Sequence, residues 1–264
     1  MLLALDTSTN YACLALADGD TLLAELNWRV GQRHGSEALE RARWLLRSQN
    51  IAMGQLDGIA VALGPGSFNG VRVAVATAKT LAFALDIPLY GVPTLDSIAW
   101  GARLSADPVW ALLDAGRGEV FAACYDTSAD DRFTDGSDDS AAAAAWAPRR
   151  VADAAASPYL IITPEALAAR ISGPVVFTGE WRATTHDVLA LALGAQARFT
   201  SSVGARRGAW LAELAMWRAR RGAADDPRAL EPLYLRRPNI TSSARTPTTP
   251  AASQPGGEEA AHAL

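Results

Sequence analysis

The segment that most constrains the fold is a short apolar run that enters a glycine-rich loop and then a strongly periodic helix. Residues 58–63 are apolar, and residues 64–70 have the sequence Gly-Pro-Gly-Ser-Phe-Asn-Gly. Apolar residues then recur at helical spacing from Val71 to Leu85, and Asp86-Ile87-Pro88 ends the helix. A strand, a tight loop and a helix in this order indicate an α/β fold. They also place backbone amides at a helix start, where an anion binds favourably.

The loop itself departs from the standard phosphate-binding patterns. No Gly-Lys-Ser/Thr follows at the Walker spacing, and Asn69 stands where a dinucleotide fingerprint requires its third glycine. Gly64, Gly66 and Ser67 therefore have two interpretations of equal weight. They contact an anion or a partner, or they make a tight turn that needs positive φ at its glycines.

A second polar loop follows the first apolar run, residues 2–6. Asp6, Thr7 and Ser8 lie where actin-like and sugar-kinase-like ATPases place a first phosphate-binding loop. Aspartate, serine and threonine also cap ordinary turns, and the sequence alone favours that simpler interpretation.

The rest of the pattern is mixed α/β. Ser36 and Thr94 are expected to cap helices, and Thr163-Pro164 is expected to begin one. Strands are predicted at 12–17, 21–28, 87–92, 109–114, 119–125 and 174–178, and helices at 37–50, 95–103, from 163, 185–199 and around 210–217.

Composition excludes several classes of protein. The chain has 264 residues, of which 50% are hydrophobic and 20% charged, so it is neither disordered throughout nor fibrous. Its net charge of −4 excludes a protein that binds nucleic acid by bulk positive charge. Residues 126–156 are acidic and then alanine-rich, which predicts an exposed insertion, and residues 241–264 have the composition of a disordered tail.

Metal and nucleophile patterns are missing from the sequence. His34, His186 and His262 have no zinc spacing, and no Gly-x-Ser-x-Gly occurs. Cys13 and Cys124 lie in apolar runs and are expected to be buried thiols. The N-terminus lacks the basic flank and long apolar stretch of a signal peptide, and no membrane span is apparent, so we expect a cytoplasmic protein.

Taken together, several segments resemble the TsaB/YeaZ family. Their order and spacing match from residue 1 to about 125, whereas the middle of the chain diverges. Asn69 and Gly116 depart from the threonine and arginine typical of the family, which puts ligand contacts at those loops in doubt. The matching segments are 3–9, 34–37, 64–73, 76–79, 87–88, 114–121 and a closing segment at 231–237.

The resemblance implies an α/β, actin-like (ASKHA, ribonuclease H-like) fold of two lobes, the second reduced. We expect an N-terminal lobe at 1–104, a C-terminal lobe at 105–240 and the tail at 241–264. It also implies a role in making N6-threonylcarbamoyladenosine (t6A) beside the tRNA anticodon. The chain would be a non-catalytic subunit supporting the metal-binding transferase TsaD, together with TsaE, and would meet tRNA only through the complex. Only His34 remains near the paralogue's histidine pair, so no metal site is expected.

By the same resemblance, the two N-terminal helices join the subunits. The surface of the helix at 71–85 is kept small by Ala74, Ala76, Thr77 and Ala84, which favours close packing of another helix, and Trp44 lies off the apolar stripe of the first helix. The face is also expected to self-associate when TsaD is absent. The expected interface residues are Ser36, Glu37, Glu40, Trp44, Arg72, Ala76, Thr77 and Lys79, the last being the only lysine.

Two alternatives stay open. The chain could be a stand-alone actin-like ATPase or kinase, or a glycopeptidase-like enzyme. No cofactor of its own is expected, and ATP or ADP at the subunit junction is a further alternative, with the anion loop drawn from Asp6, Thr7, Ser8, Gly64, Gly66 and Ser67.

Overall fold

The first of two sheets contains both antiparallel and parallel strand pairs. The structure, a computed structural model, describes residues 1–30, 34–126, 157–201 and 208–236. The strands of the first sheet lie in the order β3-β2-β1-β4-β5, with β1 antiparallel to β2 and parallel to β4. A tight turn at residues 18–20 joins β2 to β3, as its Asp-Gly sequence predicts. The bounds are β1 Leu2–Asp6, β2 Tyr11–Asp18, β3 Thr21–Arg29, β4 Gly58–Ala62 and β5 Leu89–Val92.

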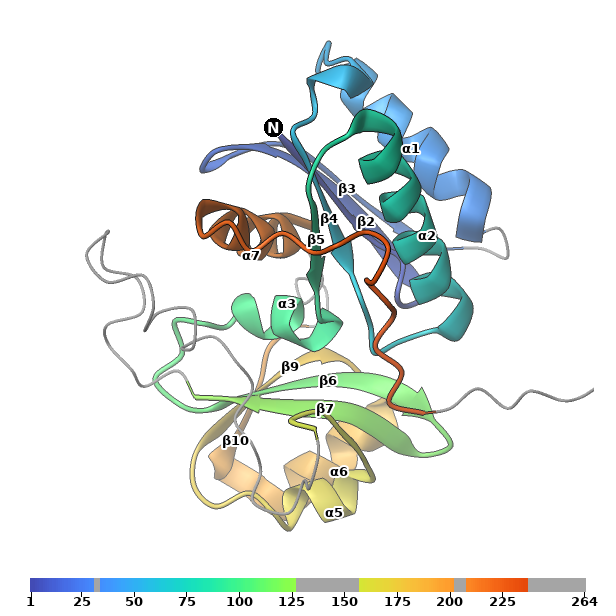
Figure 1. The fold of residues 1–264 in the computed structure, drawn as a ribbon. Coiled ribbons are helices and arrows are strands. Elements are labelled where there is room, and N and C mark those ends of the chain that lie inside the picture. The colour runs from blue at the N-terminus through green and yellow to red at the C-terminus, as the bar shows by residue number, and fades with distance from the viewer. Residues whose placement is uncertain (31–33, 127–156, 202–207, 237–264) are drawn as a thin grey trace, which may run out of the picture.

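The second sheet repeats the topology of the first. Its order is β10-β9-β6-β7-β8, with β6 antiparallel to β7 and parallel to β9. This duplication of one strand pattern confirms the predicted two-lobed, actin-like α/β fold (Figure 1). The bounds are β6 Val109–Gly116, β7 Glu119–Tyr125, β8 Leu160–Ile162, β9 Val175–Glu180 and β10 Ala197–Phe199.

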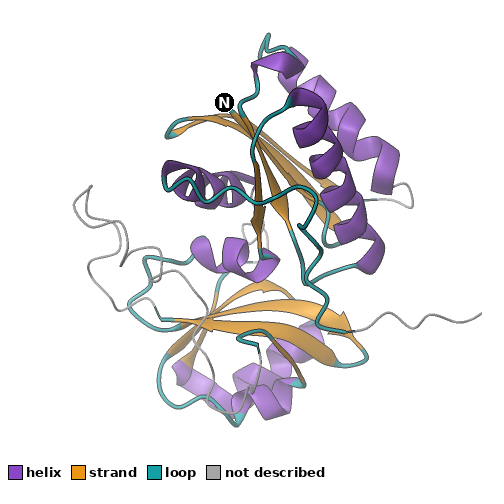
Figure 2. Ribbon diagram, in the orientation of Figure 1, coloured by secondary structure: helices purple, strands orange, loops and turns teal. Residues whose placement is uncertain are grey.

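Helices separate the sheets and cover their outer faces (Figures 1 and 2). The pair α1 (His34–Ser48) and α2 (Phe68–Leu85) covers the outer face of the first sheet, and α7 (Gly208–Arg220) lies on its inner face. The short helix α3 (Thr94–Trp100) lies between α7 and the second sheet. The pair α5 (Pro164–Ala168) and α6 (Ala183–Leu193) covers the second sheet. Short 3₁₀ turns occupy Met53–Gln55 and Gly194–Gln196.

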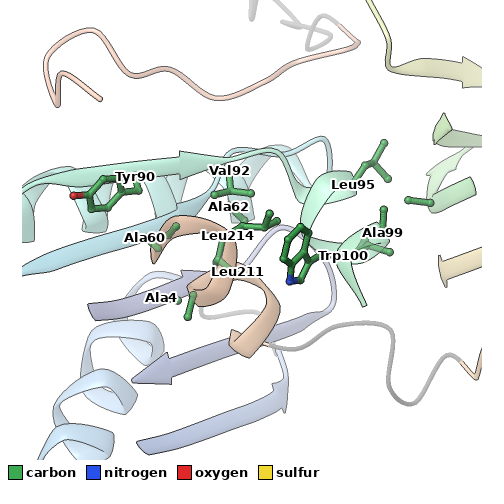
Figure 3. Packing of buried hydrophobic residues seen from close by; sticks show 14 of the residues in the cluster. Ala4, Ala60, Ala62, Tyr90, Val92, Leu95, Ala99, Trp100, Leu211 and Leu214 are labelled. Atoms are coloured by element: carbon green, nitrogen blue, oxygen red, sulfur yellow. The ribbon is translucent and has the colours of Figure 1, made fainter. Parts of the chain in front are cut away.

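The inner helices build a core that both lobes share (Figure 3). Ala4, Ala60 and Ala62 on the central strands are fully or almost fully buried, and their small side chains leave room for Leu211 and Leu214 of α7. The same cluster continues through α3 to apolar residues of β6 and β7. Because α3 buries apolar area on both of its sides, the hydrophobic effect holds the two lobes together in addition to their covalent connection.

The structure corrects several sequence predictions. The helix expected at 185–199 ends at Leu193, because Gly194 has φ +56° at its C-cap, and Phe199 belongs to β10. Pro93, not Thr94, is the N-cap of α3. The first helix begins at His34, so Ser36 lies within it and is not its N-cap.

The boundary between the lobes also differs from the expectation. The second lobe was expected to extend to residue 240, yet α7 packs on the first sheet, so the chain returns to the first lobe from residue 208 (Figure 1). Residues 127–156 of the expected insertion and all of the expected tail lie outside the described residues. None of the helices in the described ranges is long and apolar enough to span a bilayer.

Candidate functional site

The two polar loops expected to bind an anion lie in direct contact with each other. The hydroxyl of Thr7 donates to the carbonyl oxygen of Gly70 at 2.7 Å, and the amide of Ser67 donates to the carbonyl oxygen of Ser8 at 2.6 Å. A Cβ atom on Gly66 would lie 2.9 Å from the Ser8 side chain, and one on Gly70 would lie 3.2 Å from the Thr7 carbonyl carbon. Glycine is therefore required at both positions for the loops to approach.

The polar groups of this junction have partners within the protein. The Asp6 carboxylate accepts from the amide of Ser8 at 2.8 Å, the Ser67 hydroxyl accepts from the amide of Gly70 at 3.4 Å, and Thr94 Oγ1 accepts from the amide of Gly64 at 3.0 Å. The Thr94 hydroxyl also donates to Ser8 Oγ at 3.3 Å. These contacts match the turn-forming interpretation of both loops, because four of their amides already donate to protein oxygens.

A cleft of about 560 Å³ lies between the lobes beside this junction. Of the six residues expected in an anion loop, Ser8, Gly66 and Ser67 line the cleft. Asp6, Thr7 and Gly64 belong to the junction but are not among the lining residues. The second lobe contributes residues 114–117 and 180–182, and residues 233–236 close a third side.

Two arginines that line the cleft, Arg182 and Arg236, form ion pairs. Arg182 Nε lies 2.7 Å from the Asp114 carboxylate, and Arg236 forms an ion pair with Glu119. Arg236 also donates to the carbonyl oxygen of Ala115 at 3.1 Å. These side chains are partly exposed, so each pair contributes little to stability by itself.

The outer surface of α2 presents a line of exposed residues. Arg72, Ala76, Thr80 and Phe83 follow one another at helical spacing, and Phe83 is 76% exposed. Because Thr80 donates its hydroxyl to the carbonyl oxygen of Ala76 at 2.8 Å, the middle of this line presents little unsatisfied polarity. We call these four residues the α2 stripe.

The neighbouring helix adds an exposed aromatic side chain. Trp44 on α1 is 55% exposed, which agrees with its expected position off the apolar stripe. Glu40 is also exposed, and Glu37 lies 3.9 Å from Arg41 in an i,i+4 pair. The side chain of Ser36 lies outside the described residues.

Three residues expected at this surface have different surroundings. Ala74 is buried in the core of its own lobe, and Thr77 is only partly exposed. The Lys79 ammonium donates to the carbonyl oxygens of Leu230 at 3.1 Å and Arg228 at 3.5 Å, so it holds a later segment of the chain. That contact spans about 150 residues, and no local sequence signal predicts it.

A second group that the sequence did not indicate lies between α3 and the second sheet. Asp96 Oδ1 accepts from the hydroxyls of Tyr125 at 2.6 Å and Tyr159 at 2.8 Å. Although Asp96 as a residue is only partly buried, desolvation of its carboxyl group raises its pKa to about 6, against the lowering effect of the two tyrosine hydrogen bonds. Burial likewise raises the pKa of both tyrosines. In the described part of the chain, no group of three or more His, Cys, Asp or Glu side chains could hold a metal ion.

Comparisons with known proteins agree on one family. The family described as TsaD, tRNA N6-adenosine threonylcarbamoyltransferase, matches residues 29–239. The tRNA threonylcarbamoyladenosine biosynthesis protein TsaB of Bacillus subtilis (strain 168) is 38% identical over 124 residues, which cover 47% of this chain and 54% of the relative. TsaB of Escherichia coli (strain K12) is 33% identical over 126 residues, with the same shares. The chain thus spans about half the length of the curated relatives it matches.

A solved structure extends the similarity beyond the N-terminal lobe. YeaZ from Pseudomonas aeruginosa superposes with a TM-score of 0.63 at 25% identity, covering 89% of this chain and 99% of that chain. The matched region therefore includes both sheets. With the family match over residues 29–239 and the TsaB relatives, this similarity shows that the chain belongs to the TsaB/YeaZ family, within the wider family of TsaD-like proteins.

Proposed function

We propose that this chain is a non-catalytic subunit in the synthesis of t6A in tRNA, and that it binds TsaD through the exposed surface of α1 and α2. The observation that carries the proposal is the exposed α2 stripe, together with the exposed Trp44 on α1, the helix that packs against α2. The names of the TsaB relatives support the pathway. We expect TsaE to join the same complex, and we expect this chain to contact tRNA only indirectly, through that complex.

The shape of this surface suits helix packing. Ala76 and Thr80 at the middle of the stripe let another helix approach closely, and Phe83 and Trp44 supply large apolar side chains of the kind that dominate interface energies. In water, an aromatic residue exposed to 76% gains apolar burial only when something covers it. We expect TsaD to bind over these side chains, and a second copy of this chain to bind there when TsaD is absent.

The junction of the two loops supports a non-catalytic role. A phosphate-binding loop offers free amides to its ligand, whereas the amides of Ser8, Gly64, Ser67 and Gly70 donate to protein oxygens. The Asp6 carboxylate is likewise occupied with the amide of Ser8. These groups hold the turns together.

Phe83→Arg and Ala76→Arg test the docking surface. Each places a charge on the stripe, and Ala76→Arg also adds bulk. We therefore expect loss of copurification with the cognate TsaD and no fall in melting temperature. Leu191→Arg is the matched control, because Leu191 is 89% exposed on α6 of the other lobe. Retained binding by both stripe variants, or equal loss in the control, would refute the proposal.

An enzymatic role is the second candidate, because the cleft between the lobes lies beside the two loops. In that case the isolated chain would hydrolyse ATP. We expect no turnover by the isolated chain, and any nucleotide affinity to depend on TsaD. Steady ATP hydrolysis by the isolated protein, abolished by Asp6→Asn, would favour the enzyme.

A further inference from the structure

The last described segment, residues 221–236, crosses from the first lobe to the second, and we call it the strap (Figure 1). It begins after α7 on the edge of β5, where the amide of Asp225 donates to the carbonyl oxygen of Leu89 at 2.8 Å. The Asp225 carboxylate accepts from the amide of Gly91 at 2.6 Å and from Arg218 at 2.9 and 3.0 Å. The start of the strap is therefore fixed to the first lobe by charge-assisted hydrogen bonds.

Lys79 fixes the middle of the strap. Its ammonium binds the carbonyl oxygens of Arg228 and Leu230, and the Leu230 side chain packs against the core of the first lobe. A short turn closes here, since the amide of Leu230 donates to the carbonyl oxygen of Asp226 at 2.9 Å. Residues 225–230 thus form an anchor that belongs to the first lobe.

The final six residues of the strap are held more weakly. The amide of Leu233 donates to the carbonyl oxygen of Leu63 at 2.7 Å, and the ring of Tyr234 lies 5.1 Å from that of Phe68. Across the cleft, Arg236 binds Glu119 and the carbonyl oxygen of Ala115. Both charged side chains are about one-third exposed and Tyr234 is 40% exposed, so water screens these contacts.

No residue of the strap is as buried as the core residues, and Leu233, Tyr234, Leu235 and Arg236 all line the cleft. A segment with few buried apolar contacts opens at a lower free energy than the domain unfolds. Its release would remove one side of the cleft and separate the partly buried Leu235 from the shared core, while the buried side chains of α3 and α7 in that core keep their contacts with one another.

We propose that residues 231–236 are a lid that opens and closes over the cleft between the lobes, hinged on an anchor at residues 225–230. The ion pair of Arg236 with Glu119 is the latch. The inference concerns the isolated chain and does not depend on TsaD binding.

Hydrogen exchange measured by mass spectrometry on the full chain tests the lid. Arg236→Ala removes the latch, and we expect peptides covering 231–236 to exchange roughly five- to tenfold faster, the loss of one screened ion pair and one hydrogen bond. Peptides from β1, β4 and β5 should be unchanged. The control is Arg228→Ala, which changes an exposed side chain of the anchor while keeping its carbonyl group.

Lys79 supplies an independent measurement, because it is the only lysine in the chain. If the anchor stays in place while the lid opens, the rate at which an amine-reactive reagent acylates Lys79 should be the same in Arg236→Ala and the unmodified protein. Three outcomes would overturn the proposal. The first is that Arg236→Ala leaves the exchange rate at 231–236 unchanged. The second is that, in the unmodified protein, 231–236 exchanges as slowly as the core strands. The third is that Arg236→Ala accelerates exchange in the anchor together with the lid.

Discussion

Replacing Gly70 by alanine tests the contact between the two loops most directly. An added Cβ would overlap the Thr7 carbonyl oxygen and lie 3.2 Å from the carbonyl carbon, both of them backbone atoms. The overlap with the oxygen sets the size of the shift, because Cβ atoms essentially never come within 3.0 Å of another heavy atom, so the loops must separate by roughly 1 Å. Overpacking of this kind costs about 1–3 kcal/mol. The separation also strains the hydrogen bond from Thr7 to Gly70, worth about 1 kcal/mol.

Alanine also has a compensating effect, because Gly70 lies in the first turn of α2 and alanine favours a helix by up to about 1 kcal/mol. We therefore expect a net loss of about 1–3 kcal/mol in the free energy of unfolding. At roughly 2–4 °C per kcal/mol for chains of this size, the melting temperature should fall by about 2–12 °C. Thermal unfolding followed by circular dichroism measures this shift.

Gly54→Ala is the matched control. Its Cβ would meet nothing within 4 Å, so the same substitution should leave the melting temperature unchanged or raise it slightly. If Gly70→Ala melts within 1 °C of the unmodified protein, the two backbones do not touch as described, and the turn-forming account of the junction fails.

Two further predictions concern Asp96 and Lys79. Folding raises the pKa of Asp96 from 3.8 to about 6, so the folded protein binds the proton on Asp96 more tightly than the unfolded chain does. The stability gained in this way is fully present below about pH 4 and is lost as the pH rises through about 6. Urea unfolding at several pH values should show the unmodified protein losing stability relative to Asp96→Asn over that range, and a difference independent of pH would contradict this. Lys79→Met should cost about 1–2 kcal/mol by releasing the carbonyl groups of Arg228 and Leu230, yet keep TsaD copurification. Lost binding at unchanged stability would instead assign Lys79 to the interface.

Local periodicity explains which elements the sequence could predict. The spacing of Val71, Val75, Ala78 and Ala82 predicts a helix with one buried face, and all four are buried in α2. The hairpin of β2 and β3 is equally local, since the turn at 18–20 and the two apolar strands on either side of it lie within about 20 residues. Such elements are specified by neighbours in the chain.

Contacts between distant residues explain what the sequence could not predict. Thr94 has the side chain of an N-cap, yet its hydroxyl binds Gly64 and Ser8, which only the folded chain brings near. The apolar spacing up to Phe199 continues past Gly194, so periodicity alone missed the end of α6. The role of Lys79 depends on a segment about 150 residues away. At the candidate site, the sequence indicated that the two polar loops belong together. It did not indicate that their amides and hydroxyls hydrogen-bond to each other's oxygens.

The position of α7 has a consequence for how the protein is made. The inner face of the first sheet consists of strands synthesised within the first 92 residues, but the helix that covers it begins at residue 208. During translation that apolar face emerges from the ribosome long before its cover exists. A nascent chain that has produced every strand of the N-terminal sheet therefore still exposes an aggregation-prone apolar face, and we expect newly made protein to need chaperones until α7 has left the ribosome.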